Sequence, residues 1–288
     1  MGSTRGGRVP IGTPTGPWPA STLPAMARTR LDHLLVERGL FESRSRAAAA
    51  VMAGGVRLGH DGRRAYKPGQ MIATEEALAV DAPPRFVSRG GEKLATALDS
   101  FGVDPAGRLC LDVGASTGGF TDCLLQRGAD HVVAVDVAYG ELHWRVRSDD
   151  RVTVVERRNA RSLEASELPY RPDLVVADVS FISLAKVLPA VLDVTAVRFD
   201  CLALVKPQFE VGRERVGRGG VVREAGERRA ALVSVARVAR DLGSAVLGFA
   251  SSGLPGPAGN RESFVRLTEA GRPGDVPDLE QAARRAEP

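Results

Sequence analysis

The chain has 288 residues, of which 43% are hydrophobic, 26% are charged and three are cysteines. This length predicts about two domains with cores that need no disulfide bonds, which excludes a peptide toxin or a disulfide-stapled mini-scaffold. No apolar run approaches the ~18 residues of a membrane-spanning helix, and the cysteine spacing fits no metal site, so we expect a cytoplasmic protein without a membrane or metal partner.

The charge is distributed unevenly along the chain. Residues 1–85 contain 12 Arg or Lys and 7 Asp or Glu, a net charge of +5, whereas residues 86–288 contain 27 and 28, a net charge of −1. A basic front on a neutral body favours a nucleic-acid-binding module, although an ordinary solvated surface fits the same charge.

The first third of the chain predicts an extension, a small domain and a linker. Residues 1–27 are rich in Gly, Pro, Ser and Thr, which indicates a disordered or non-native extension. Residues 28–82 predict a small α+β domain, in which one helix stops at Gly39, a second is capped by Ser43, and short strands follow a turn at Asp61. The prolines of residues 83–88 predict a linker.

Residues 89–270 predict an α/β domain. Helical segments alternate with seven strands, which indicates a doubly wound parallel sheet, and the last two strands are close enough to form an antiparallel hairpin. Residues 207–223 lack periodicity and predict a mobile active-site loop, and residues 271–288 read as a polar tail. The expected strands are 109–114, 131–137, 152–155, 173–180, 201–207, 245–252 and 263–268.

A glycine-rich turn follows the first of these strands. Gly114 opens the turn, and Asp136 ends the next strand 22 residues later, where an acid can hold ribose hydroxyls. The glycine spacing is not G-x-G-x-x-G, and Asp112 would place negative charge at the mouth, so the pattern favours S-adenosylmethionine over a nicotinamide dinucleotide. Asn159 is a candidate contact for the adenine edge. A tight turn in any α/β domain remains the alternative.

Lysine is rare in this chain, since only four of its 39 basic residues are lysines. Unlike arginine, a lysine can lose its proton and act as a general base. Lys206 ends the fifth strand and Asp178 ends the fourth, so both are expected at the same ligand-binding edge of the sheet. Lys186 is predicted to be a solvated helix residue. Lys67 lies in a predicted turn, where we expect it to contact either nothing or a phosphate.

Several long motifs resemble known families. The segments RGGEKL at 89–94, LDVGASTGGFTDCLL at 111–125, DLVVADVSFISL at 173–184, LVKPQFEVG at 204–212 and GNRESFVRL at 259–267 resemble FtsJ-type methyltransferases. Residues 28–268 as a whole resemble the TlyA (haemolysin A) family of ribosomal RNA 2′-O-methyltransferases.

The resemblance implies a class I S-adenosylmethionine-dependent fold, a Rossmann-like seven-stranded sheet with its last strand antiparallel. It implies cytidine ribose targets in small- and large-subunit rRNA, with Lys206 as the general base of a Lys-Asp-Lys-Glu tetrad. The tetrad falls on Lys93, Asp178, Lys206 and Glu262. The expected cofactor-binding residues are Asp112, Gly114, Ala115, Ser116, Gly118, Gly119, Phe120, Asp136, Asn159 and Asp178.

The front domain resembles the small RNA-binding domain of ribosomal protein S-four. Because few exposed aromatic residues are expected, phosphate contacts rather than base stacking should position ribosomal RNA or a ribosomal subunit, and no obligate protein partner is implied. The expected phosphate contacts are Arg28, Arg30, Arg44, Arg46, Arg57, Arg63 and Arg64.

Three other functions are open to the same sequence. A non-catalytic RNA-binding or ribosome-assembly protein would not need the complete tetrad. A membrane-active haemolysin would need apolar spans or amphipathic stripes. A nicotinamide-dependent oxidoreductase would need a different glycine spacing.

Overall fold

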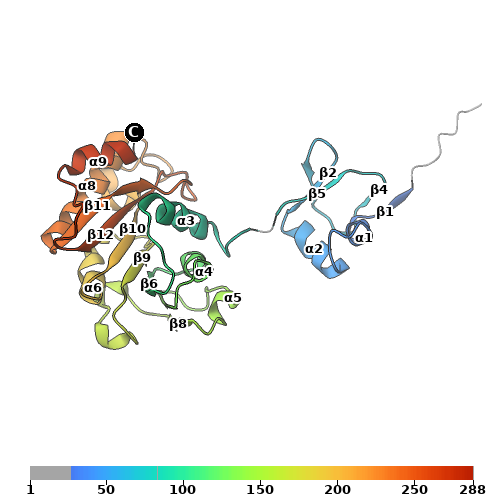
Figure 1. Ribbon diagram of the computed structural model, residues 1–288. Coiled ribbons are helices and arrows are strands. Elements are labelled where there is room, and N and C mark those ends of the chain that lie inside the picture. The colour runs from blue at the N-terminus through green and yellow to red at the C-terminus, as the bar shows by residue number, and fades with distance from the viewer. Residues whose placement is uncertain (1–26, 83, 288) are drawn as a thin grey trace, which may run out of the picture. The chain divides into compact units, whose positions relative to one another are not determined.

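The computed structural model describes residues 27–82 and 84–287, which form two compact units divided between Pro83 and Pro84. Figure 1 shows both units, and each is described by itself below, as the front unit and the back unit. The expected extension covers residues 1–27, of which residues 1–26 lie outside the described part of the chain.

The front unit combines two short helices with two small antiparallel sheets. Helix α2 begins as predicted, because Ser43 Oγ accepts a hydrogen bond of 3.3 Å from the Arg46 backbone nitrogen and caps the first turn. The first strand was not predicted, and its residue Arg28 pairs with Ala73 of another strand. The elements are β1 (Arg28–Arg30), α1 (Leu31–Glu37), α2 (Arg44–Met52), β2 (Val56–Leu58), β3 (Arg63–Arg64), β4 (Met71–Ala73) and β5 (Leu78–Val80).

The back unit is the predicted α/β fold around a seven-stranded sheet (Figure 1). The strand order is β11-β12-β10-β9-β6-β7-β8, in which β12 runs antiparallel to both neighbours and the pairs from β10 to β8 are parallel. The strands are β6 (Leu109–Val113), β7 (His131–Val135), β8 (Val152–Val155), β9 (Leu174–Ala177), β10 (Asp200–Val205), β11 (Ser244–Ser251) and β12 (Ser263–Glu269).

Helices cover both faces of this sheet. The α-helices are α3 (Arg89–Phe101), α4 (Gly119–Gln126), α5 (Trp144–Arg147), α6 (Leu188–Asp193), α7 (Pro207–Glu210), α8 (Ala225–Asp241) and α9 (Leu279–Ala286). The 3₁₀ helices are η1 (Ala160–Ser162), η2 (Ala165–Glu167), η3 (Leu184–Lys186) and η4 (Arg213–Arg215).

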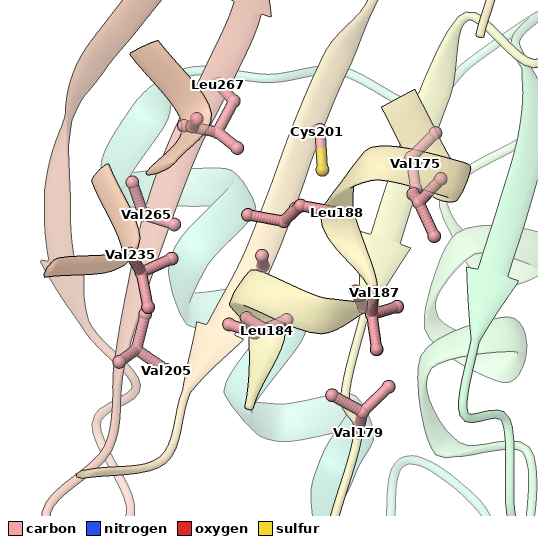
Figure 2. Close-up of a cluster of buried hydrophobic side chains, with 14 of the residues drawn as sticks. Val175, Val179, Leu184, Val187, Leu188, Cys201, Val205, Val235, Val265 and Leu267 are labelled. Atoms are coloured by element: carbon pink, nitrogen blue, oxygen red, sulfur yellow. The ribbon is translucent and has the colours of Figure 1, made fainter. Parts of the chain in front are cut away.

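Successive residues of a central strand are buried on opposite faces. In β10, Cys201 packs in a cluster with residues of α6, α8 and α9, whereas Leu202 packs in a second cluster with residues of α3 and α4. Figure 2 shows part of the first cluster, around Cys201. Burial on both faces explains why these strands are apolar without alternation.

The start of the back unit differs from the predicted linker at residues 83–88. Phe86 is only 2% exposed and belongs to the second core cluster. Asp122 Oδ2 accepts a hydrogen bond of 2.8 Å from the Val87 backbone nitrogen, and Gln126 Nε2 donates to the Arg85 carbonyl at 2.9 Å. Residues 85–88 therefore pack on the back unit instead of forming a free connection.

Two later segments also differ from the predictions. Residues 207–223, expected as a loop, contain α7 and η4. Residues 271–288, expected as a polar tail, contain α9, whose first turn is capped by Asp278 and whose Leu279 and Ala283 are buried. Only two of its residues are buried, and its polar composition concealed this helix in the sequence. No helix within residues 27–82 and 84–287 is both long and apolar enough to cross a bilayer.

Candidate active site

Four predicted site residues lie at one edge of the sheet. Gly114, Asp136, Asp178 and Lys206 are each the first residue after β6, β7, β9 and β10, respectively. Because these strands are parallel neighbours, their carboxyl ends meet at the edge where open α/β sheets bind ligands.

Lys206 and Asp178 form an ion pair across two neighbouring strands. Lys206 Nζ lies 2.6 Å from Asp178 Oδ1 and donates a hydrogen bond of 2.7 Å to Ser180 Oγ. Both side chains are mostly buried, at 12% exposed for Lys206 and 24% for Asp178. The strand ends therefore hold the amine in a defined position that still reaches the solvent.

Lys93 and Glu262 form a second ion pair, which is more deeply buried. Lys93 extends from α3 and donates a hydrogen bond to Glu262 Oε2, just before β12. The Glu262 side chain is 1% exposed, and its other oxygen, Oε1, has no hydrogen-bond partner among the described residues. A buried carboxylate oxygen without a partner is costly, and a ligand hydroxyl would satisfy it.

The two ion pairs line one cavity of about 360 Å³. A larger cavity of about 1240 Å³ adjoins it, and Gly114, Ser116 and Asp178 line both. The structure thus brings all four predicted tetrad residues together beside a space large enough for a second ligand. Ala115, Gly119 and Phe120, predicted to bind the cofactor, line the smaller cavity instead of the larger one.

Asp136 and Asn159 line the larger cavity. The Asp136 carboxylate is oriented by two backbone donors, Ser116 N and Ala138 N, each at 2.7 Å. Each carboxylate oxygen can still accept another hydrogen bond. Asn159 Oδ1 accepts from Arg161 N at 3.1 Å and caps η1, and its amide NH₂ donates no hydrogen bond to the described residues.

The glycines of the turn are required by the protein's own packing. A Cβ on Gly114 would lie 2.5 Å from the Asp178 carbonyl oxygen, and a Cβ on Gly118 would lie 2.8 Å from a Leu142 methyl. Both residues have left-handed φ angles, +85° and +89°. Gly118 lines neither cavity, and the structure gives it a role in forming the turn.

Asp112 differs from its predicted place at the mouth of the site. It is fully buried within β6, lines neither cavity, and accepts a hydrogen bond of 2.6 Å from Thr121 Oγ1. The pKa of Asp112 is raised to about 7, mainly by burial and to a smaller extent by the nearby Asp178 and Asp136 carboxylates. Its Oδ1 has no hydrogen-bond partner in the described structure.

Phe181 and Lys186 are two further residues at the larger cavity, and neither was predicted there. Phe181 is 92% exposed, and its ring centroid lies 5.4 Å from that of Phe209. Its φ of +64° is strained for a residue with a side chain, and such strain is concentrated at functional sites. Lys186 belongs to η3 and lines the cavity, although its position suggested a solvated helix residue.

In the front unit, most of the arginines that were predicted to contact RNA form ion pairs with carboxylates of the same unit. Asp32 accepts from Arg30 at 2.8 Å and from Arg44 at 3.1 Å, which holds the pKa of Asp32 well below its usual range. Arg64 forms no ion pair among the described residues, and Tyr66 offers this unit an aromatic side chain that is 77% exposed. The other pairs are Arg46–Glu42, Arg57–Asp81 and Arg63–Glu76, and Arg28 donates to the Met71 carbonyl.

Comparison with known proteins finds relatives along nearly the whole chain. The profile of the FtsJ-like methyltransferase family matches residues 86–269. The chain is 50% identical over 262 residues to the 16S/23S rRNA (cytidine-2'-O)-methyltransferase TlyA of Mycobacterium tuberculosis, covering 90% of this chain and 97% of that protein. It is 32% identical to the 23S rRNA (cytidine-2'-O)-methyltransferase TlyA of Campylobacter jejuni, covering 62% of this chain and 69% of that protein.

A solved structure is similar over the same length. The "Putative hemolysin" from Streptococcus thermophilus has a TM-score of 0.69 and 41% sequence identity, and the match covers 91% of this chain and 96% of that one.

Proposed function

Because the chain belongs to the FtsJ-like methyltransferase family, we propose that it transfers a methyl group from S-adenosylmethionine to the ribose 2′-oxygen of cytidines in ribosomal RNA. The targets lie in both small- and large-subunit RNA, as the name of the relative that is 50% identical states for that protein, rather than in the large subunit alone.

One observation carries this proposal, namely the two adjoining cavities that share Asp178. All four tetrad residues line the smaller cavity, and the ribose-holding candidate Asp136 lines the larger one. A transferase needs a donor and an acceptor side by side, so that a bimolecular step becomes effectively unimolecular. Two cavities that meet at the ion-paired Asp178 supply that arrangement.

The residues of the larger cavity fit S-adenosylmethionine. Asp136 would accept hydrogen bonds from the ribose hydroxyls, and the Asn159 amide would meet the adenine edge. Asp112, two residues before Gly114, has a carboxylate oxygen without a hydrogen-bond partner among the described residues. A positively charged ligand bound at the glycine turn would favour the ionised form of this carboxylate. S-adenosylmethionine, when bound, supplies a methyl group on a positively charged sulfur.

Lys206 acts as the general base. In its neutral form, Nζ would accept the proton of the ribose 2′-hydroxyl as the oxygen attacks the methyl carbon. The O–H and S–CH₃ bonds would break while the N–H and O–CH₃ bonds form, and the sulfur would leave as a neutral thioether. Asp178, at 2.6 Å, stabilises the resulting ammonium. A separate base is needed because a ribose hydroxyl is a poor nucleophile at neutral pH.

Glu262 and Lys93 orient the acceptor. The free oxygen Glu262 Oε1 accepts a hydrogen bond from the ribose, and the ion pair with Lys93 fixes that carboxylate in place. The exposed ring of Phe181 offers the attached base an aromatic surface for stacking, a contact worth ~1–3 kcal/mol.

The front unit provides affinity for RNA. Its described cations include Arg64, Lys67 and the carboxylate-paired arginines, whose positions are preset by their partners. Contacts of this kind with phosphates position an RNA without reading its sequence.

The proposal is tested with purified protein, labelled S-adenosylmethionine and ribosomal subunits from cells that lack the modification. We expect label in 2′-O-methylcytidine after digestion of the RNA to nucleosides. Label in a methylated base would contradict the assignment of the acceptor. Tight binding of cofactor and RNA without transfer would instead support a non-catalytic ribosome-assembly protein.

A further inference from the structure

The penultimate residue of the chain is buried in an ion pair. Glu287 follows α9, and its Oε1 accepts hydrogen bonds from Arg228 Nε at 2.8 Å and Arg228 Nη2 at 2.6 Å. The side chains of Glu287 and Arg228 are only 6% and 9% exposed. Arg261 Nη1 lies 3.7 Å from the same oxygen, and Arg229 Nη1 donates to the Glu287 carbonyl at 3.3 Å. We call Glu287, Arg228 and Arg261 the C-terminal clamp.

The C-terminal clamp is joined to the loop before α8. The remaining donor of Arg228, Nη1, reaches the carbonyls of Val222 at 3.3 Å and Arg223 at 2.5 Å. Arg228 thus links the end of the chain to the end of the segment 207–223, which begins directly after Lys206.

The same loop is tied to the segment that carries Glu262. Asn260 is 1% exposed, its Oδ1 accepts from Val222 N at 2.9 Å, and its Nδ2 donates to the Gly220 carbonyl at 2.8 Å. Arg261 of the C-terminal clamp stands between Asn260 and Glu262 in the chain. Contacts from Glu287 therefore reach the residues before Glu262 directly through Arg261 and indirectly through Arg228, Val222 and Asn260.

From these contacts we infer that Glu287 is a positioning residue for methyl transfer, which holds the segment bearing Glu262 through Arg228 and Arg261. This inference rests on the proposed function. A buried ion pair is seldom retained for stability, because well-packed apolar residues of similar size often stabilise a fold as well or better. Arg228, however, also supplies backbone contacts that an apolar residue cannot replace.

The test compares three variants, Glu287→Met, Arg228→Met/Glu287→Met and the control Arg237→Met/Glu280→Met. The control removes an exposed ion pair that also joins α8 to α9, with side chains 65% and 55% exposed. Rates are measured well below the lowest melting midpoint, so that unfolding does not contribute to any loss of kcat.

We expect Glu287→Met to lower the melting midpoint, because it leaves the Arg228 charge buried without a partner. The double variant should regain the part of the midpoint that was lost to the unpaired charge, although it also lacks the Arg228 contacts with the Val222 and Arg223 carbonyls. Its kcat should not recover and should stay about tenfold to a hundredfold below that of the wild type, because small misplacements far from the chemistry have effects of this size. The KM for RNA and the Kd for S-adenosylmethionine should stay within about twofold, and the control should match the wild type in every measurement.

Amide hydrogen exchange gives a readout that does not need activity. The Val222 amide, bound to Asn260, should exchange at least about tenfold faster in the double variant than in the control. Recovery of kcat together with the melting midpoint, or unchanged exchange at Val222, would overturn the inference. Absence of methyl transfer by the wild type would contradict the proposed function instead, while exchange at Val222 would still decide whether the C-terminal clamp holds this segment.

Discussion

Replacing Lys206 by arginine separates a base from a fixed positive charge. The wild-type amine lies 2.6 Å from Asp178 Oδ1 and donates to Ser180 at 2.7 Å. A guanidinium keeps the charge and can keep both contacts, but it does not give up a proton, because arginine remains protonated in proteins. The substitution therefore removes the ability to accept a proton and keeps the positive charge and the two contacts.

The expected loss follows from the role assigned to the amine. General base catalysis typically contributes about 10²–10⁴ in rate, which corresponds to ~3–5 kcal/mol of activation free energy. The Asp178 pair survives, and both side chains are less than a quarter exposed, so the fold should be retained. The Kd for S-adenosylmethionine should change by no more than about threefold, which is less than ~1 kcal/mol.

This loss is measured as the rate of single-turnover methyl transfer to ribosomal subunits, because that rate does not depend on product release. Lys67→Arg is the matched control, because a phosphate contact in a front-unit turn needs only the charge, and its rate should equal that of the wild type. A Lys206→Arg rate within a few-fold of the wild type would refute the general-base assignment and leave Lys206 as an electrostatic positioner.

Three other predictions concern the cofactor, the buried acid and the front unit. Asp136→Ala should weaken S-adenosylmethionine binding by ~1–3 kcal/mol in calorimetry, because the ribose loses its acceptor, and an unchanged Kd would place the cofactor elsewhere. The pKa of Asp112 is raised to about 7 by burial, so the folded state holds a proton that the unfolded state releases between pH ~4 and 7. The free energy of unfolding relative to Asp112→Asn should therefore fall as the pH rises through this window and level off above it; a flat difference across the window would show that Asp112 is ionised throughout. A chain that begins at Pro84, and so keeps Phe86 in its core, should bind the cofactor but lose most RNA affinity and much of its salt dependence, whereas affinity equal to that of the full chain would contradict docking by the front unit.

The back unit was largely predictable because its signals are local and strong. Apolar strands of four to six residues indicated the parallel sheet. The polar residues that directly follow three of them, Asp136, Asp178 and Lys206, were thereby placed at one edge. The pairing of Lys93 with Glu262 was not predictable from local signals, because the two residues are 169 positions apart and lie on a helix and a loop. Only the family resemblance paired them, because no periodicity connects residues at such a separation.

Other features depended on tertiary packing that no local pattern reveals. Phe86 looked like part of a linker because two prolines precede it, yet its burial places it in the core. Asp112 looked like a mouth residue because it precedes a glycine turn, but its position within β6 points it into the interior. The last helix was hidden by a polar composition, and Glu287 became visible only through its ion pair with Arg228.

Mapping of 2′-O-methylation on ribosomal RNA tests the central claim most directly. Ribosomes from cells that lack the protein are compared with those from cells producing the wild type or Lys206→Arg. We predict methylated cytidine riboses in both subunits with the wild type and their absence with Lys206→Arg at equal protein levels. Ribose methylation that is identical in all three strains, or a methyl group that appears only on bases, would contradict the account.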